Sequence, residues 1–229
     1  MEILSRGLNI LCKNDIETEA LITQQYEEIL RILKLYINEI ELFNPAYGLV
    51  GAENTDELII KHILDSIAPV GILSRLLKTV HTENNNKTFQ IADVGSGAGL
   101  PGIPLAIVFP SYNFTLIERM GRRVGFLQNT KAVLGLSNIT IEENEIEKTT
   151  LGPFDMITFR AFKPLEPKLL RTLFKKCLPN GIIAAYKGKQ GKIEAEIASV
   201  SSSNKHWEAI SYTVPFLDEE RHLVTGINL

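Results

Sequence analysis

Three glycines stand at alternate positions in the stretch DVGSGAG, which runs from Asp93 to Gly99. The apolar run Phe89–Val94 before them is typical of a buried strand, and the residues after them are typical of a helix. Glycine weakens the interior of both elements, so its use here indicates that something must approach the backbone closely. Free amide groups at the start of the helix favour a negatively charged group. We therefore expect Asp93, Gly95, Gly97 and Gly99 to form a ligand-binding turn.

Two classes of nucleoside cofactor compete for this turn. A dinucleotide fingerprint, G-x-G-x-x-G, needs a glycine where Leu100 stands. The spacing here, G-x-G-x-G with an acid two residues before the first glycine, resembles the loop of S-adenosylmethionine-dependent methyltransferases of Rossmann-like fold. Glu118, about 20 residues on, ends the next predicted strand and can accept both ribose hydroxyls, as acids at this place do in NAD enzymes. Glu118 thus supports a nucleoside cofactor without choosing between the classes, and a merely tight turn stays an alternative.

The elements around the turn alternate between strands and helices, which predicts a mostly parallel sheet covered on both faces. Strands are predicted at Phe89–Val94, Asn113–Ile117, Ile139–Glu143, Asp155–Phe159 and Ile182–Tyr186, and helices at Leu100–Val108, Gly121–Leu134 and Leu165–Cys177. Two further strands, Trp207–Val214 and Arg221–Asn228, are joined too closely for a parallel crossover and should pair antiparallel. The prediction is an α/β fold: a seven-stranded sheet that ends in an antiparallel hairpin.

The N-terminal region shows helical periodicity instead. Asn14, with Glu17 three residues later, is a predicted helix N-cap. Asn44-Pro45 is expected to end the helix that follows, and a second helix is predicted from Thr55 to about Ile67. One apolar stripe occupies Tyr26, Leu30, Leu33, Ile37 and Ile40.

A polar stretch, HTENNNKT, is the best internal boundary. It divides the chain into a helical extension over residues 1–80, a linker over residues 81–88 and a main domain over residues 89–229. We expect the extension to pack on the main domain.

Composition limits the class of protein. The 229 residues are 45% hydrophobic, enough for a sizeable core, and contain no apolar run of 18 residues. The two cysteines, Cys12 and Cys177, form neither a disulfide framework nor a zinc site. We expect a cytoplasmic protein without a metal or a membrane segment, and a monomer by default.

The net charge of −3 argues against a general nucleic-acid binder, but the charge is uneven. Residues 1–88 hold 8 basic and 13 acidic residues, whereas residues 89–229 hold 16 and 14. Between Arg160 and Lys192, nine basic residues accompany one acid, Glu166. Such a stretch is either a solvated surface or a surface for a polyanion such as RNA.

Six ordered motifs make the chain similar to the RsmG family, also called GidB, of bacterial 16S ribosomal RNA methyltransferases. They are KHILDS (Lys61–Ser66), DVGSGAGLPGIPL (Asp93–Leu105), RRVGFL (Arg122–Leu127), FRAF (Phe159–Phe162), YKG (Tyr186–Gly188) and PFLDEERHLV (Pro215–Val224). The chain departs from the family near Asn44–Val50, at Glu118 and at Phe159. The resemblance implies a Rossmann-like class I methyltransferase that transfers a methyl group from S-adenosylmethionine to a guanine N7.

The resemblance also implies roles for particular residues. Cofactor contacts are implied at Gly95, Leu100, Ile146, Glu147 and Arg160, with Glu118 holding the ribose. The RNA-binding candidates, which lie at or after strand ends, are Arg122, Arg123, Phe162, Lys163 and Lys187. The expected RNA partner is 16S ribosomal RNA or a particle of the small ribosomal subunit.

The expected chemistry is consistent with the absence of motifs that other classes of methyltransferase need. Guanine N7 carries a lone pair and no proton, so the reaction needs placement and no general base, and we assign no catalytic residue. The Asp/Asn-Pro-Pro-aromatic motif of amino-group methyltransferases does not follow the fourth strand, where FRAF stands. The alternatives are a methyltransferase acting on a small molecule or protein, and a cofactor-binding regulator without catalysis.

Overall fold

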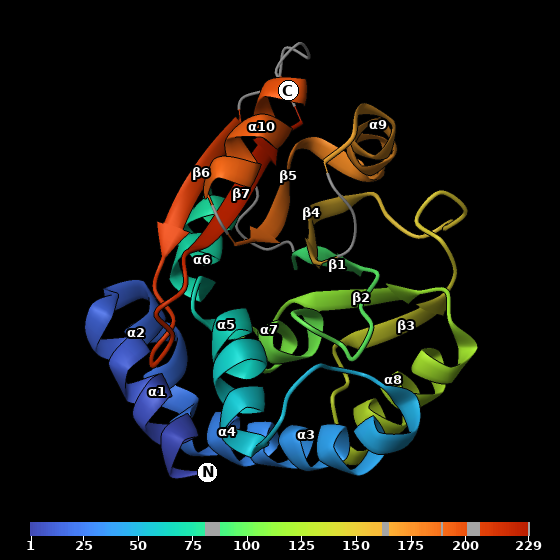
Figure 1. Cartoon of the computed structure of the whole chain (residues 1–229). Helices are drawn as coiled ribbons and strands as arrows, with labels where there is room; N and C mark the ends of the chain where they lie inside the picture. Colours follow the sequence, from blue (N-terminus) through green and yellow to red (C-terminus); the bar gives the residue numbers. More distant parts are fainter. Residues whose placement is uncertain (81–87, 162–164, 189, 201–206, 229) are drawn as a thin grey trace.

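A single mixed sheet organises the molecule. The computed structural model describes residues 1–80, 88–161, 165–188, 190–200 and 207–228. Its strands are β1 (Gln90–Val94), β2 (Asn113–Glu118), β3 (Ile139–Glu143), β4 (Phe154–Arg160), β5 (Cys177–Lys187), β6 (Trp207–Tyr212) and β7 (Arg221–Ile227). The sheet order is β3-β2-β1-β4-β5-β7-β6; β1 to β5 are parallel, and β7 runs antiparallel to both neighbours (Figure 1). The predicted seven-stranded sheet with its antiparallel hairpin is confirmed.

Helices cover both faces of the sheet, and alternate strand residues face opposite layers, as the pleat requires. In β5, Ile182 and Ala184 join one apolar cluster, whereas Ile183 and Ala185 join the other. The first cluster includes residues of α7 (Gly102–Val108), α8 (Gly121–Leu134) and the N-terminal helices. The second includes residues of α9 (Pro167–Lys176) and α10 (Gln190–Val200). The inner parallel strands β1 and β4 are therefore buried on both sides, as in other doubly covered sheets, whereas the edge strand β3 is partly exposed.

The N-terminal extension shares its core with the sheet. Its helical segments are α1 (Glu2–Asn14), α2 (Ile16–Ile22), η1 (Thr23–Gln25), α3 (Tyr26–Tyr47), α4 (Thr55–Leu58), the π-helical turn η2 (Ile59–Leu64), α5 (Asp65–Ile67) and α6 (Val70–Val80). The apolar cluster that holds Leu4 and Leu33 continues without a break to Leu223 in β7. The predicted packing of the extension on the sheet is therefore a shared hydrophobic core. All of the predicted linker, residues 81–88, except its last residue lies outside the described part of the chain, so the domain boundary stays a prediction.

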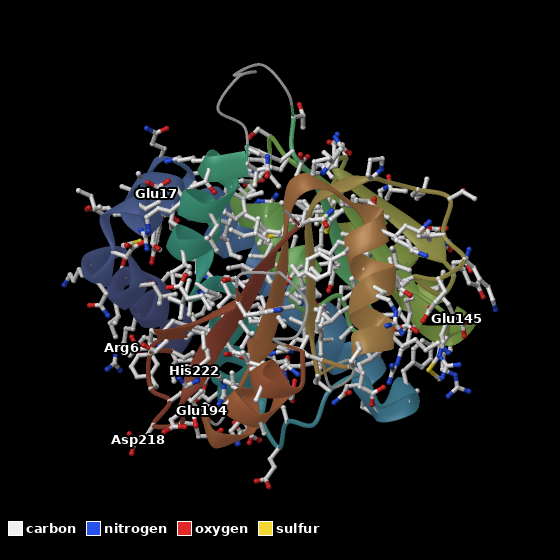
Figure 2. All side chains as sticks on the ribbon, turned by 90° about the horizontal axis from the view of Figure 1, so that it is seen from above. Arg6, Glu17, Glu145, Glu194, Asp218 and His222 are labelled. Carbon is white, nitrogen blue, oxygen red and sulfur yellow. The ribbon has the colours of Figure 1, made fainter. Side chains whose placement is uncertain are left out.

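Polar contacts join the helices of the extension to each other. Glu17 of α2 accepts hydrogen bonds from Ser74 Oγ (2.6 Å) and Lys78 Nζ (2.5 Å) on α6. In Figure 2, Glu17 marks the side of the molecule formed by these helices, and Glu145 after β3 marks the opposite side. Helices α2 and α6 thus lie away from the β3 edge, whereas α3 extends to α8, where Asn129 Nδ2 donates to Glu39 Oε2 at 2.6 Å.

Two predicted helix ends in the extension are wrong. Asn14 ends α1, a helix that was not predicted, and the N-cap of α2 is Asp15, whose carboxylate accepts the Thr18 N–H at 3.0 Å. Pro45 does not end α3, which continues to Tyr47. Gly48 ends it instead, with a left-handed φ of 58° that glycine adopts at little cost. A proline in the last turn removes one hydrogen bond, and this structure tolerates that loss.

Two further differences concern the second half of the main domain. Cys177, predicted as the end of a helix, is the first residue of β5, which is longer than the predicted Ile182–Tyr186. Helix α10 was not predicted at all. Within the described residues, no helix is long and apolar enough to cross a membrane.

The shared core predicts that the extension and the sheet unfold together. Leu33 on α3 is fully buried, so Leu33→Ala should lower the free energy of unfolding by about 2–5 kcal/mol. Trp207, the single tryptophan, lies on β6 and reports on the far end of the sheet. In Leu33→Ala, the tryptophan fluorescence and the far-UV circular dichroism should change together in one unfolding transition. That transition should lie at a lower denaturant concentration than in the wild-type chain.

The matched control for this variant is Leu42→Ala on the same helix, because Leu42 is 71% exposed. Its unfolding transition should lie close to that of the wild-type chain. Two separate transitions, with the tryptophan signal unmoved by Leu33→Ala, would contradict a shared core.

Candidate cofactor and substrate site

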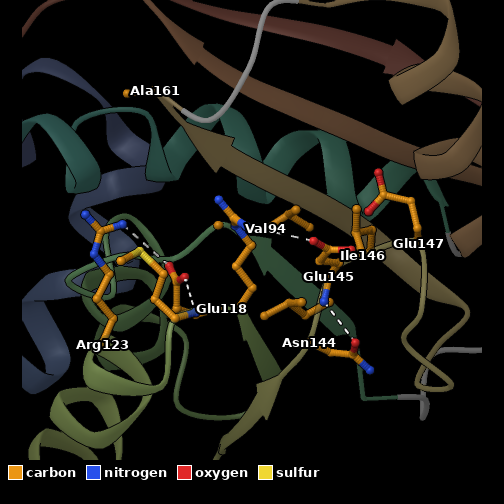
Figure 3. A pocket seen from close by; sticks show the side chains of 12 residues that line it. Val94, Glu118, Arg123, Asn144, Glu145, Ile146, Glu147 and Ala161 are labelled. Atoms are coloured by element: carbon orange, nitrogen blue, oxygen red, sulfur yellow. Dashed lines mark hydrogen bonds and ion pairs between the residues drawn. The ribbon is translucent and has the colours of Figure 1, made fainter.

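A cavity of ≈ 460 Å³ opens where β1, β2, β3 and β4 end (Figure 3). Its size lies within the range of about 300–1,000 Å³ that is usual for small-molecule sites. Its lining residues are Val94, Gly95, Ile117, Glu118, Arg119, Met120, Arg123, Asn144, Glu145, Ile146, Glu147 and Ala161. The sheet order reverses its direction between β1 and β4, and ligands of open α/β sheets bind beside such a switch point.

The three glycines of the turn all adopt left-handed backbone conformations, but the space around them differs. Their φ angles are 70° at Gly95, 58° at Gly97 and 89° at Gly99. A Cβ on Gly97 would meet only Gly95 O, at 3.8 Å, so space remains over this backbone. A Cβ on Gly99 would lie 2.4 Å from Ile103 Cδ1, so that glycine is needed for packing against α7. Open backbone is therefore found at Gly97, and Gly95 lines the cavity itself.

Glu118 at the end of β2 fastens the turn to the neighbouring strand. Its Oε2 accepts the Gly97 N–H at 2.9 Å, and its Oε1 accepts the Met120 N–H at 2.9 Å. The side chain is 4% exposed, and Arg123 Nη1 lies 3.9 Å from Oε2. Because each carboxylate oxygen has a second lone pair, Glu118 can still accept hydroxyl donors from a ligand in the cavity.

Asp93, another predicted contact, lies beneath the turn and does not line the cavity. Its Oδ2 accepts the Gly102 N–H at 3.0 Å at the start of α7. Its Oδ1 is buried and has no hydrogen-bond partner among the described residues. Burial raises the pKa of this carboxyl to about 7, although the bond from Gly102 opposes the shift. Asp93 therefore supports the turn from inside the fold.

The two residues implied after β3 differ in exposure. Ile146 is 1% exposed and Glu147 is exposed, and both line the cavity. Met120, Asn144 and Ala161 also line it and were not predicted. Asn144 and Ala161 directly follow strands and Met120 is the N-cap of α8, and those positions are the signal that could have identified them.

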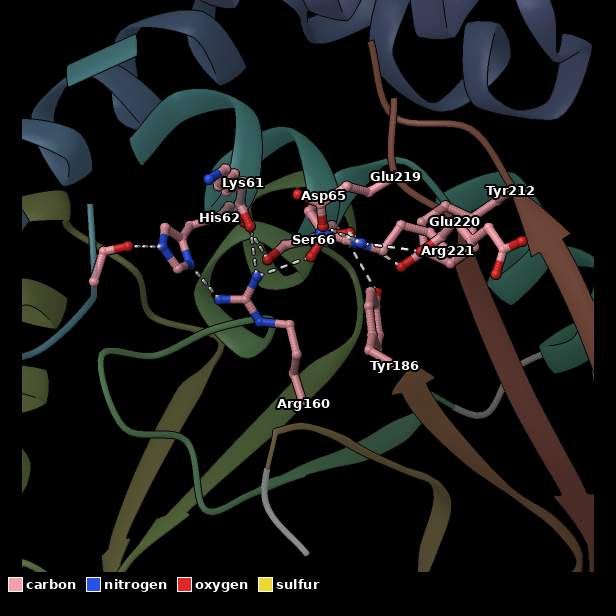
Figure 4. Close-up of polar contacts among 11 residues, drawn as sticks. Lys61, His62, Asp65, Ser66, Arg160, Tyr186, Tyr212, Glu219, Glu220 and Arg221 are labelled. Carbon is pink, nitrogen blue, oxygen red and sulfur yellow. Dashed lines mark hydrogen bonds and ion pairs between the residues drawn. The ribbon is translucent and has the colours of Figure 1, made fainter. Parts of the chain in front are cut away.

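Arg160, implied as a cofactor contact, points from the end of β4 toward the N-terminal extension (Figure 4). Its Nη1 donates to Lys61 O at 3.1 Å and to Asp65 Oδ2 at 3.0 Å, and its Nη2 lies 3.1 Å from His62 Nδ1. Because arginine can only donate, His62 Nδ1 is the acceptor and Nε2 carries the proton toward Gly51 O at 3.3 Å. Burial, then the Arg160 charge, lowers the pKa of His62.

Asp65 is the centre of this polar group, and its role was not predicted from the sequence. Its Oδ1 accepts from Tyr212 Oη and Arg221 Nε, both at 3.2 Å, while Oδ2 holds Arg160. One carboxylate thus joins the extension to β4, β6 and β7 (Figure 4). Its place in the KHILDS motif was the signal available in the sequence.

The RNA-binding candidates do not form one group. Arg122 is exposed and lies over the Tyr47 ring at 5.5 Å, whereas Arg123 lines the cavity. Lys187 forms an ion pair with Glu196 at 2.8 Å. Phe162 and Lys163 lie outside the described residues. Among the described His, Cys, Asp and Glu residues, no group of three or more is arranged to hold a metal ion.

The buried Asp93 carboxyl predicts a pH effect on stability. Its pKa is about 7 in the folded chain, whereas the ordinary value of 3.8 applies in the unfolded chain. Between pH 3.8 and pH 7 the unfolded chain therefore binds fewer protons than the folded chain. The Asp93 contribution to stability is complete below pH 3.8 and is lost as the pH rises to about 7, at up to about 1.4 kcal/mol per pH unit.

Asp93→Asn removes this titration and keeps an acceptor for Gly102 N–H. The unfolding free energy of the wild-type chain minus that of the variant should therefore fall by a few kcal/mol between pH 4 and about pH 7 and then level off. Urea denaturation at several pH values measures this difference. A difference that stays constant with pH would show that Asp93 is ionised throughout.

Two comparisons of sequence agree with the site. Residues 29–224 match the GidB family, described as rRNA small subunit methyltransferase G. The chain is 35% identical to a Ribosomal RNA small subunit methyltransferase G of Treponema denticola, over 97% of this chain and 92% of that protein. It is 40% identical to a protein of the same name from Treponema pallidum (strain Nichols), over 84% of this chain and 82% of that protein.

Solved structures add the fold. A methyltransferase from Pyrococcus furiosus superposes with a TM-score of 0.54 at 15% identity, covering 86% of this chain and 97% of that one. A putative O-methyltransferase from Klebsiella pneumoniae gives a TM-score of 0.55 at 15% identity, covering 85% and 90%. The fold is thus that of Rossmann-like methyltransferases, and the sequence matches are more specific: the chain belongs to the GidB family of small-subunit ribosomal RNA methyltransferases.

Proposed function

We propose that this chain transfers a methyl group from S-adenosylmethionine to N7 of a guanine in 16S ribosomal RNA. The observation that carries the proposal is the meeting of the left-handed turn at Gly95 and Gly97 with the Glu118 carboxylate on one cavity. Open backbone beside a buried acid is the arrangement that a ribose and its attached chain require. The residues present therefore fit a nucleoside cofactor.

The predicted cofactor residues divide into contacts and supports. Gly95, Glu118, Ile146 and Glu147 line the cavity and are the proposed contacts, together with the open backbone at Gly97. Asp93, Gly99 and Leu100 lie below this surface, where they set the shape of the turn. Arg160 remains a proposed cofactor or phosphate contact; it would offer N–H donors beyond those that hold Lys61, His62 and Asp65.

The proposed reaction asks for positioning. When bound, S-adenosylmethionine supplies an electrophilic sulfonium methyl group. Guanine N7 has a lone pair and no proton to lose, so the chain needs only to hold the base in line with that group and to exclude water. Buried apolar residues at the cavity floor, such as Val94, Ile117 and Ile146, suit this task.

RNA binding is proposed for the basic residues near the carboxyl ends of the strands. Arg122 is exposed, with its guanidinium held over Tyr47, and is the best placed of them to contact a phosphate. Lys187 would contribute from its ion pair with Glu196. We further propose that the chain acts as a monomer in the cytoplasm and that its substrate is naked 16S RNA or a small-subunit particle.

The central test is methyl transfer to ribosomal RNA from cells that lack the gene. The purified chain and methyl-labelled S-adenosylmethionine should place the label in the 16S fraction as 7-methylguanine on nucleoside analysis. Label in 6-methyladenine, in protein or in small molecules, or no label at all, would contradict the proposal.

Charge reversal separates RNA binding from cofactor binding. Arg122→Glu should weaken RNA binding and reduce by about 1 the slope of log affinity against log salt concentration, with cofactor affinity unchanged. Arg123→Glu should in addition weaken cofactor binding, because it replaces the cation 3.9 Å from Glu118 with a fourth acid on the cavity wall. Filter binding and calorimetry measure the two affinities, and equal cofactor affinity in both variants would argue against this cavity.

A further inference from the structure

We propose that Tyr36, on helix α3 of the N-terminal extension, is a positioning residue for the cofactor-binding turn. This inference rests on the proposed function of the cavity and goes beyond it, because it assigns to the extension a part in cofactor affinity. The juxtaposition that carries it is a hydrogen bond from Tyr36 Oη to the carbonyl of Ala98, at 2.7 Å. Ala98 stands between Gly97 and Gly99 in the turn.

The bond lies entirely inside the protein. Tyr36 is 0% exposed and Ala98 is 3% exposed, so water does not replace either partner. Burial raises the pKa of the Tyr36 hydroxyl well above its ordinary value, and the group remains a neutral donor. A buried carbonyl that loses its donor stays desolvated and unpaired, so breaking this bond has a large free-energy cost.

The turn needs such a bond because of its glycines. Gly97 and Gly99 both have positive φ angles, and glycine has more backbone freedom than any other residue. Two such residues on either side of Ala98 leave this peptide free to rotate unless other groups hold it. The glycines that let a ligand approach the backbone therefore also make the turn depend on hydrogen bonds for its conformation.

Tyr36 and Ser96 together hold the peptide plane between Ala98 and Gly99. The carbonyl of Ala98 is bound by Tyr36, and the N–H on the other side of the same peptide, that of Gly99, donates to Ser96 O at 2.7 Å. Because a peptide unit is planar, bonds at both of its ends set its orientation. The neighbouring N–H of Gly97 is held by Glu118 at 2.9 Å, so the cavity side and the interior side of the turn are fixed by different elements.

Helix α3 is a rigid support for this contact. Its buried face packs in the shared core through Leu33, Ile37 and Ile40, each 0% exposed. A site is held more accurately by a packed helix than by another loop. The turn after β1 is thus positioned by residues more than 60 positions earlier in the chain.

The test is Tyr36→Phe, with Tyr186→Phe as a matched control. Tyr186 is also buried, at 4% exposed, and its hydroxyl also donates to a backbone carbonyl, that of Ser66, at 2.9 Å. The two variants remove the same atom from the same kind of bond, but only the first bond reaches the turn. Calorimetry with S-adenosylhomocysteine measures cofactor affinity, and thermal unfolding measures stability.

We expect Tyr36→Phe to bind S-adenosylhomocysteine about ten-fold more weakly, which corresponds to one ordinary buried hydrogen bond. In steady state it should raise the KM for S-adenosylmethionine with little change in the KM for RNA. Tyr186→Phe should lose similar thermal stability and keep wild-type cofactor affinity. Equal affinity of Tyr36→Phe and the wild-type chain, or equal losses of affinity in the two variants, would overturn the inference.

A second measurement does not depend on the variant folding. In the wild-type chain without ligand, hydrogen exchange at the Gly99 amide should be slowed to near the rate set by global unfolding, because both ends of its peptide are held. Fast exchange there would overturn the inference. A wild-type chain that is folded yet does not bind S-adenosylhomocysteine would instead contradict the proposed function itself.

Discussion

The backbone between β1 and α7 must turn through three left-handed residues while leaving a peptide surface open to the cavity. Its own hydrogen bonds, from Gly99 N–H to Ser96 O and from Ser96 Oγ to Asp93 O, hold only part of this segment. Three side chains from three elements hold the rest. Glu118 binds Gly97 from β2, Asp93 binds Gly102 from β1, and Tyr36 binds Ala98 from α3. The site depends on these contacts before any ligand binds.

Asp93 and Glu118, the two acids that hold the turn, have different roles because they lie at different places. Asp93 is completely buried, has one oxygen without a partner among the described residues, and has a pKa raised to about 7. Glu118 lines the cavity, accepts two backbone N–H bonds and has Arg123 within 3.9 Å. The first arrangement disfavours a negative charge on Asp93, and the second presents carboxylate oxygens to the cavity. The carboxylate suited to ribose hydroxyls is therefore at Glu118, and Asp93 serves the start of α7.

The sequence predicted the central sheet well, because buried parallel strands and their helices produce strong periodic patterns. It also located the turn and Glu118, since these follow directly from strand ends. It failed where tertiary contacts override local signals: Pro45 inside α3, and Cys177, which begins a strand where its basic amphipathic neighbours suggested a helix. The sequence could not predict the directions in which side chains point. Arg160 ends β4 as expected, but its pairing with Asp65 depends on a contact across 95 residues that no spacing reveals.

That contact explains why the extension occupies one position on the sheet. Apolar packing alone tolerates repacking, so the shared core does not by itself select a single arrangement of α3 against α7. Asp65 adds a directional contact, because its carboxylate is 6% exposed and separating it from Arg160 and Arg221 would leave buried charges unpaired. Once the helices at residues 59–67 are fixed in this way, α3 is fixed through the core they share, and the Tyr36 hydroxyl is held opposite Ala98. The polar group at the end of β4 and the bond under the turn thus join the extension to the sheet domain at two separate places.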